Sequence, residues 1–134
     1  MMPKQATAER KTKYCIDIEH ILREKGHATN VELLHELRKR YPTLTATTVH
    51  RATLRLASRG KISLAPPSKD GSTRYDSNLQ PHDHFQCTNC EKLLDTDIRN
   101  KIITVLEETI NGCSFEGRLT ISGICKRCIE GGNI

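Results

Sequence analysis

Apolar residues recur three or four positions apart in three segments of the first half of the chain, a spacing typical of amphipathic helices. The spacing predicts helices over about residues 8–25, 31–40 and 45–60. Two short runs, residues 61–64 and 72–76, flank a segment rich in Pro, Asp and Gly, which predicts a β-hairpin. The expected buried helix positions are Cys15, Ile18, Ile21, Leu22, Leu33, Leu34, Leu37, Val49, Ala52, Thr53 and Leu56.

Three helices followed by a hairpin is the order of elements in a winged-helix domain, in which the third helix enters the major groove of DNA. We therefore expect residues 1–76 to form a winged-helix DNA-binding domain. Polar residues of the third helix and its start would contact phosphates or base edges, and Lys69 of the hairpin would follow the backbone. The candidate DNA-binding residues are Thr45, Thr47, Thr48, His50, Arg51, Arg55 and Lys69. A helical bundle without a ligand is the alternative.

The charge of the chain is unevenly distributed. Residues 1–75 contain 15 Lys and Arg against 7 Asp and Glu, whereas residues 76–134 contain 6 against 9. A basic first half favours binding to nucleic acid, although a solvated basic face would have the same composition.

The pattern changes after residues 77–81, which we interpret as a hinge. Strand-like runs and one amphipathic helix, over about residues 97–111, then predict a small α/β domain spanning residues 82–134. The apolar face of this helix suits dimerisation. For the whole chain, the expected fold class is α+β. The strands are expected at residues 85–88, 93–95 and 118–124.

Four of the six cysteines form two Cys-x-x-Cys pairs, Cys87 with Cys90 and Cys125 with Cys128. Two such pairs predict a structural Zn²⁺ site with four thiolate ligands, and a closed shell of this kind leaves no position for a catalytic water. Disulfides are the alternative. The remaining cysteines, Cys15 and Cys113, are expected to be small buried apolar residues.

No apolar run approaches the roughly 18 residues that a membrane helix requires, and the start of the chain has no apolar signal segment. These features predict a cytoplasmic protein without a membrane partner. Only 4% of the residues are aromatic, so the core is expected to be small and to need the metal.

A second group of potential ligands precedes the first cysteine pair. His82 and His84 are two positions apart, so they face the same side of a strand. If the chain reverses at residues 88–89, Cys87 lies opposite Lys92 and His84 lies opposite Asp95. Antiparallel pairing would then place a carboxylate beside two imidazoles.

Four runs of residues together resemble the ferric uptake regulator (Fur) family. They are T-V-H-R-A-T-L at 48–54, D-G-S-T-R-Y-D at 70–76, H-D-H-F-Q-C-T-N-C-E-K-L-L-D at 82–95 and I-S-G-I-C-K-R-C at 121–128. The resemblance implies a winged helix followed by an α/β dimerisation domain. It also implies a homodimer that represses transcription by binding a palindromic operator in double-stranded DNA when loaded with metal.

The resemblance further implies a regulatory site for Fe²⁺ or Mn²⁺, which imidazole and carboxylate ligands suit. Asp95, in place of glutamate, is similar to the peroxide-sensing PerR branch, in which peroxide oxidises a ligand histidine and releases DNA. The alternative is a repressor that senses iron or manganese availability without peroxide chemistry. The implied regulatory ligands are His27, placed at the start of the second helix, Asp76, His82, His84 and Asp95.

Some positions depart from the family. His50 stands where tyrosine is usual, whereas Arg51 is similar to the Fur branch rather than to PerR. Gly117 and Ile102 occupy the positions of a further metal site, which we therefore expect to be absent.

Two other functional classes are alternatives for this sequence. A zinc-dependent hydrolase is disfavoured because the sequence has no HExxH or nucleophile motif, so we do not expect an enzyme. A zinc-stapled interaction module that does not bind DNA is the remaining alternative.

Overall fold

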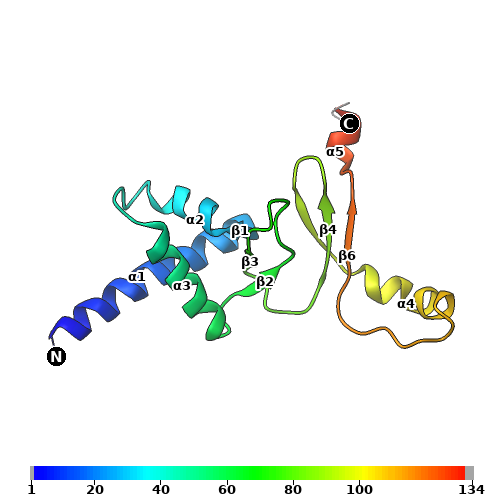
Figure 1. Ribbon diagram of the computed structural model, residues 1–134, viewed down its shortest axis with the longest axis horizontal. Helices are drawn as coiled ribbons and strands as arrows, with labels where there is room; N and C mark the ends of the chain where they lie inside the picture. The colour runs from blue at the N-terminus through cyan, green and yellow to red at the C-terminus, as the bar shows by residue number, and fades with distance from the viewer. Residues whose placement is uncertain (1, 132–134) are drawn as a thin grey trace. The chain divides into compact units, whose positions relative to one another are not determined.

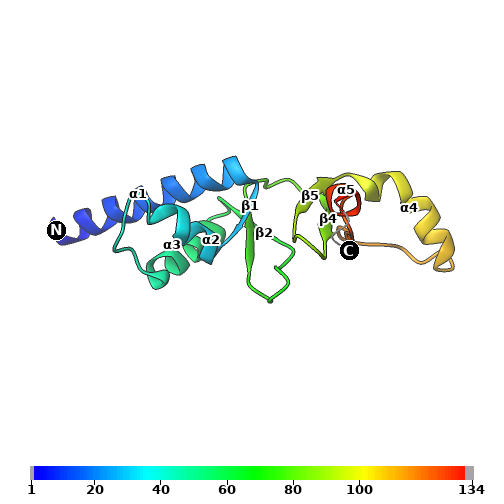
Figure 2. The same cartoon turned by 90° about the horizontal axis from the view of Figure 1, so that it is seen from above.

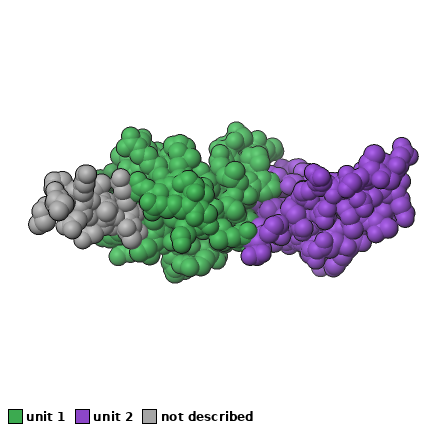
Figure 3. Space-filling model, turned by 90° about the horizontal axis from the view of Figure 1, so that it is seen from below, with its two compact units in different colours: residues 1–79 green, residues 80–134 purple. Residues whose placement is uncertain are grey.

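The computed structural model describes residues 2–131, and their side chains from residue 13 onward. The chain divides into two compact units, residues 1–79 (unit 1) and residues 80–134 (unit 2), coloured separately in Figure 3. The division falls within residues 77–81, the segment expected as a hinge. Each unit is described by itself.

Unit 1 contains three helices and a three-stranded antiparallel sheet with the strand order β1-β3-β2 (Figure 1). The predicted winged-helix arrangement of three helices and a hairpin is confirmed, but β1 was not predicted. The elements are α1 (Met2–Lys25), β1 (His27–Thr29), α2 (Asn30–Leu37), α3 (Ala46–Ser58), β2 (Ser63–Ala65) and β3 (Arg74–Asp76).

Local sequence determines where these helices begin. Thr29 caps α2 in a capping box, in which its side chain accepts from the backbone N–H of Glu32 and the Glu32 carboxylate accepts from the Thr29 N–H. Thr45 caps α3 by accepting from the N–H of Thr48. Gly26 ends α1 with φ +85°, a conformation that favours glycine, and so allows the chain to turn directly into β1.

The core of unit 1 lies between the three helices and β3. The predicted buried stripe of α3, Val49, Ala52, Thr53 and Leu56, is confirmed, because each of these residues is at most 6% exposed. The other buried residues of this core are Ile18, Leu22, Ala28, Leu33, Leu37, Leu44, Ile62 and Tyr75. Cys15, Ile21 and Leu34, also expected to be buried, are partly buried and pack against this core.

Unit 2 contains a sheet with the order β5-β4-β6, in which β4 pairs antiparallel with β5 and parallel with β6 (Figures 1 and 2). The predicted register is confirmed: His84 lies opposite Asp95, and the Cys87 N–H donates to the Lys92 carbonyl. The final short helix, α5, was not predicted. The elements are β4 (Asp83–Cys87), β5 (Leu93–Thr96), α4 (Ile98–Thr109), β6 (Thr120–Gly123) and α5 (Lys126–Glu130).

Unit 2 has little apolar core of its own. Among its described residues, the buried apolar cluster consists of Cys87, Cys125 and Cys128, with Phe85 and Ile124 packed against it. Helix α4 buries none of its residues within the single chain. Within the part of the chain that the structure describes, no helix has the length and apolar character needed to cross a bilayer.

Candidate metal centres and DNA-binding helix

The two Cys-x-x-Cys turns come together at one end of the sheet of unit 2. The four Sγ atoms lie within 4.8 Å of one another, with 3.9 Å between Cys87 and Cys128 and 3.8 Å between Cys90 and Cys125. A Zn–S bond of about 2.3 Å in a tetrahedron places the sulfur atoms about 3.8 Å apart. These separations therefore fit a zinc ion with four thiolate ligands, whereas a disulfide needs about 2.05 Å.

Backbone groups favour a thiolate in this cluster before any metal binds. The N–H groups of Cys90 and Cys125 donate to Cys87 Sγ and lower the pKa of that thiol to about 6. The Asn89 side chain lowers the pKa of the Cys128 thiol, but burial and hydrogen bonds with the other three thiols outweigh it and raise this pKa to about 11. A metal ion must therefore displace protons from the cluster, so its affinity should rise with pH.

The two remaining cysteines lie apart from this cluster and differ from each other. Cys15 is partly buried against the core of unit 1, and burial raises the pKa of its thiol. The expectation of a buried residue was wrong for Cys113, which is exposed in the connection between α4 and β6.

A group of imidazoles and a carboxylate lies along the β4–β5 ladder. Asp95 Oδ1 is 3.4 Å from His82 Nε2 and 3.5 Å from His84 Nε2, and the two ring centroids are 4.4 Å apart. The His82 Nδ1 lies 2.6 Å from the Gln80 carbonyl oxygen, which directs its Nε2 toward the carboxylate. Although β4 begins only at Asp83, both rings face Asp95, as the strand pattern predicted.

In unit 1, a second imidazole–carboxylate pair is fixed by strand pairing. His27 lies opposite Asp76 in the β1–β3 ladder, with 3.3 Å between His27 Nε2 and Asp76 Oδ2. Asp76 is 1% exposed, and its Oδ1 accepts from the Asn78 N–H. Placing His27 at the start of the second helix was wrong: it lies in β1, because Thr29 caps α2 and the helix begins at Asn30.

Sequence reasoning missed Asp83, which stands between the two histidines. Its carboxylate is fully buried and accepts from the backbone N–H groups of Arg99 at 2.8 Å and Leu119 at 3.0 Å, and from Arg118 Nε at 3.0 Å. Burial raises the pKa of Asp83, but these donors outweigh it and hold the pKa below its usual value. The Asp97 side chain makes no cap hydrogen bond at the start of α4, and the Asp83 carboxylate accepts from the Arg99 N–H of the first turn instead. Because Asp83 lies in β4 and also accepts from the N–H of Leu119, directly before β6, it connects α4 to both strands.

Asp83→Ala should lower the free energy of unfolding of unit 2 by about 3–5 kcal/mol, because it leaves two backbone N–H groups without their acceptor and removes the buried carboxylate that pairs with Arg118. Asp97→Ala is the matched control, since Asp97 is exposed and lies 3.6 Å from the same arginine; we expect it to cost less than about 1 kcal/mol. Denaturant unfolding of zinc-loaded protein, followed by circular dichroism, measures both. Equal effects of the two variants would contradict the assigned role of Asp83.

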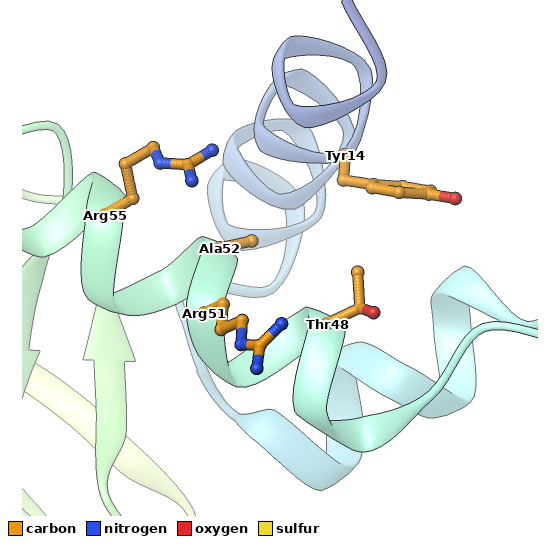
Figure 4. Close-up of a pocket in the computed structure, with 5 residues that line it drawn as sticks. All are labelled: Tyr14, Thr48, Arg51, Ala52 and Arg55. Carbon is orange, nitrogen blue, oxygen red and sulfur yellow. The ribbon is translucent and has the colours of Figure 1, made fainter. Parts of the chain in front are cut away.

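Helix α3 presents the candidate DNA contacts on its outer side. His50 and Arg51 are exposed, and Thr45 and Thr48 are partly engaged in capping the helix. A pocket of about 240 Å³ lies between α1 and α3, and Figure 4 shows the side chains that line it. It is lined by Tyr14, Thr48, Arg51, Ala52 and Arg55. Thr47 is exposed on α3, and Lys69 is exposed in the loop between β2 and β3.

Residues 6–116 match the sequence profile of the Ferric uptake regulator family, which covers most of the chain. The chain belongs to this family. Ferric uptake regulators are metal-responsive transcription regulators rather than enzymes, and they bind DNA as dimers. Within this family, the peroxide-responsive repressor PerR of Staphylococcus epidermidis is 25% identical over 116 residues, spanning 85% of this chain and 77% of that protein.

Solved structures of ferric uptake regulators and their relatives share the fold. The Campylobacter jejuni peroxide stress regulator matches with a TM-score of 0.71 and 23% identity, covering 95% of this chain and 97% of that one. The Helicobacter pylori ferric uptake regulator matches with a TM-score of 0.68 and 20% identity, covering 96% and 91%. These likenesses support the predicted α+β fold.

Proposed function

We propose that this protein is a homodimeric, metal-dependent repressor that binds a palindromic DNA operator and responds to peroxide through a regulatory Fe²⁺ or Mn²⁺ ion. In this proposal the thiolates of Cys87, Cys90, Cys125 and Cys128 hold a separate structural zinc. The proposed regulatory ligands are three imidazoles and two carboxylates: His27, Asp76, His82, His84 and Asp95.

The observation that carries the proposal is that each unit contains part of a ligand set. Unit 1 offers His27 Nε2 beside Asp76 Oδ2, and unit 2 offers two Nε2 atoms directed at one oxygen of Asp95. Neither part fills the coordination shell of a first-row metal by itself. Nitrogen and oxygen donors suit Fe²⁺ or Mn²⁺, whereas the all-sulfur cluster suits zinc.

An ion that takes ligands from both units would restrict the angle between them. In a dimer this angle sets the separation of the two α3 helices, which must match half-sites about one helical turn or a multiple of it apart. Such an ion links metal occupancy to DNA affinity by a coupling free energy, and a largely complete switch needs about 5 kcal/mol. The apolar face of α4, with Val105 63% exposed in the single chain, is available for the dimer contact.

Peroxide response is supported by the similarity to a peroxide-responsive repressor and by the aspartate at position 95. Bound iron would supply the redox chemistry that adds an oxygen atom to an imidazole. The chain supplies the target rings, His27 and His82, which are 12% and 15% exposed, and holds each one beside a carboxylate.

The test begins with metal analysis of purified protein before and after dialysis against a mild chelator. We expect one retained zinc and one labile ion per chain. Iron-loaded protein is then treated with peroxide, and its peptides are examined by mass spectrometry. We expect one added oxygen atom on His27 or His82 together with loss of binding to an operator selected from random duplexes, and no added oxygen in protein holding zinc alone.

Two other outcomes decide against parts of the proposal. Metal-dependent DNA binding without histidine oxidation would support a repressor that senses iron or manganese availability. Failure to bind any duplex at low salt, with both metals present, would contradict DNA binding altogether and favour an interaction module stabilised by zinc.

A further inference from the structure

Three side chains connect the outer surface of α3 to the start of α2. Asn30 Nδ2 lies 3.3 Å from His50 Nδ1, and the Thr53 hydroxyl donates to Asn30 Oδ1 at 2.9 Å. Thr53 is fully buried and His50 is exposed, so the chain of contacts runs from the core of unit 1 to its surface.

The direction of these hydrogen bonds determines where the His50 ring carries its proton. The Thr53 hydroxyl also lies 3.0 Å from the His50 carbonyl oxygen, but Asn30 Oδ1 can only accept, so the hydroxyl donates to Asn30 Oδ1 and the amide nitrogen faces the histidine. An amide nitrogen only donates, so His50 Nδ1 must be the unprotonated acceptor. The neutral ring then carries its proton on Nε2 and presents an N–H donor.

The position of His50 makes this donor relevant to DNA. His50 is the fifth residue of α3, Ala46–Ser58, and the N-terminal residues of a recognition helix are those that contact base edges. In the major groove, purine N7, guanine O6 and thymine O4 accept hydrogen bonds, whereas the amino groups of adenine and cytosine donate them.

We propose that His50 is a specificity-determining residue that selects a hydrogen-bond acceptor on a base edge through Nε2–H, and that Asn30 and Thr53 are positioning residues that fix its tautomer. The inference rests on the proposed function of α3 as the recognition helix. The His50 tautomer is a property of the free protein, whereas the base contact exists only in the complex with DNA, so the two can be tested separately.

The tautomer is tested first, on the zinc-loaded full chain without DNA. Long-range ¹H–¹⁵N NMR at a pH where the ring is neutral should show protonated Nε2 and unprotonated Nδ1 for His50. In Asn30→Asp the amide donor becomes a carboxylate, which only accepts, so the proton should move to Nδ1. A protonated Nδ1 in the unmodified protein, or an unchanged spectrum in the variant, would overturn the assignment.

Base selection is tested with the manganese-loaded dimer and a pool of randomised duplexes. His50→Ala should lose its preference at one base pair of each half-site, where the unmodified protein discriminates roughly 10-fold, the lower end of the range for one good base contact. Alanine favours helix and His50 is exposed, so the variant should fold. His35→Ala changes an exposed histidine on α2 and is the matched control, expected to select the same sequence as the unmodified protein.

The outcomes separate this inference from the proposed function. If the unmodified protein and His50→Ala select identical sequences with equal stringency, DNA binding stands and the role of His50 is wrong. If removing the acceptor atoms of the selected base pair one at a time with base analogues leaves binding of the unmodified protein unchanged, the donor assignment is wrong. If the unmodified protein binds no duplex, the proposed function and this inference both fall.

Discussion

Cys90→Ser will leave unit 2 unfolded and the protein monomeric, whereas Cys113→Ser will leave both fold and assembly unchanged. Cys90 Sγ lies 3.8 Å from Cys125 Sγ within the four-thiol cluster, and Cys113 is exposed outside it. The buried apolar cluster described in unit 2 consists largely of the ligands themselves, so losing zinc removes the main stabilising contribution. Structural zinc sites contribute on the order of 10 kcal/mol of apparent binding free energy, more than a unit of this size can replace.

The measurement combines zinc content, circular dichroism and size-exclusion chromatography for the two variants and the unmodified protein. Unit 1 has its own core and should keep its helical signal, so the loss should appear in unit 2 and in the dimer. A folded, dimeric Cys90→Ser protein would show that the cluster is not the structural site. A strong chelator applied to the unmodified protein should reproduce the effect of Cys90→Ser, because both remove the same ion.

The features that the sequence predicted well depend on local periodicity. The α3 stripe of Val49, Ala52, Thr53 and Leu56 follows from helical spacing alone. The β4–β5 register follows from a tight turn between two strands, which pairs His84 with Asp95. In both cases residues close in the chain determine the geometry, so no knowledge of distant contacts is needed.

The features that were missed depend on partners distant in the sequence. Strand β1 has only three residues, too few for a period to appear, and exists because it pairs with β3 nearly fifty positions later. This error also placed His27 in the wrong element. Asp83 gave a usable signal: on a strand where His82 and His84 face one side, the residue between them faces the other. The sequence does not show that Arg118 and the start of α4 lie on that other side, because both are distant from Asp83 along the chain and only the fold brings them together.

The effect expected at the proposed regulatory site is also large, but it leaves the fold intact. Asp95→Ala should weaken Fe²⁺ or Mn²⁺ binding at least about 100-fold, because loss of groups that only support metal ligands already costs 10- to 100-fold. One oxygen of Asp95 lies within 3.5 Å of both His82 Nε2 and His84 Nε2, so its loss also leaves these rings without their shared partner. Metal-dependent DNA binding should be lost together with the affinity for Fe²⁺ or Mn²⁺.

Asp97→Ala separates this effect from a general loss of negative charge. Asp97 follows Asp95 by two positions but, being 65% exposed and near Arg118, it has no place among the proposed ligands. Isothermal titration with Mn²⁺ on zinc-loaded dimers should give unchanged affinity for Asp97→Ala and a large loss for Asp95→Ala, with equal zinc content and melting temperature. Unchanged Mn²⁺ affinity in Asp95→Ala would remove Asp95 from the ligand set. Because Asp95 is the carboxylate that unit 2 places beside His82 and His84, the proposed regulatory site would then consist of the other four ligands only.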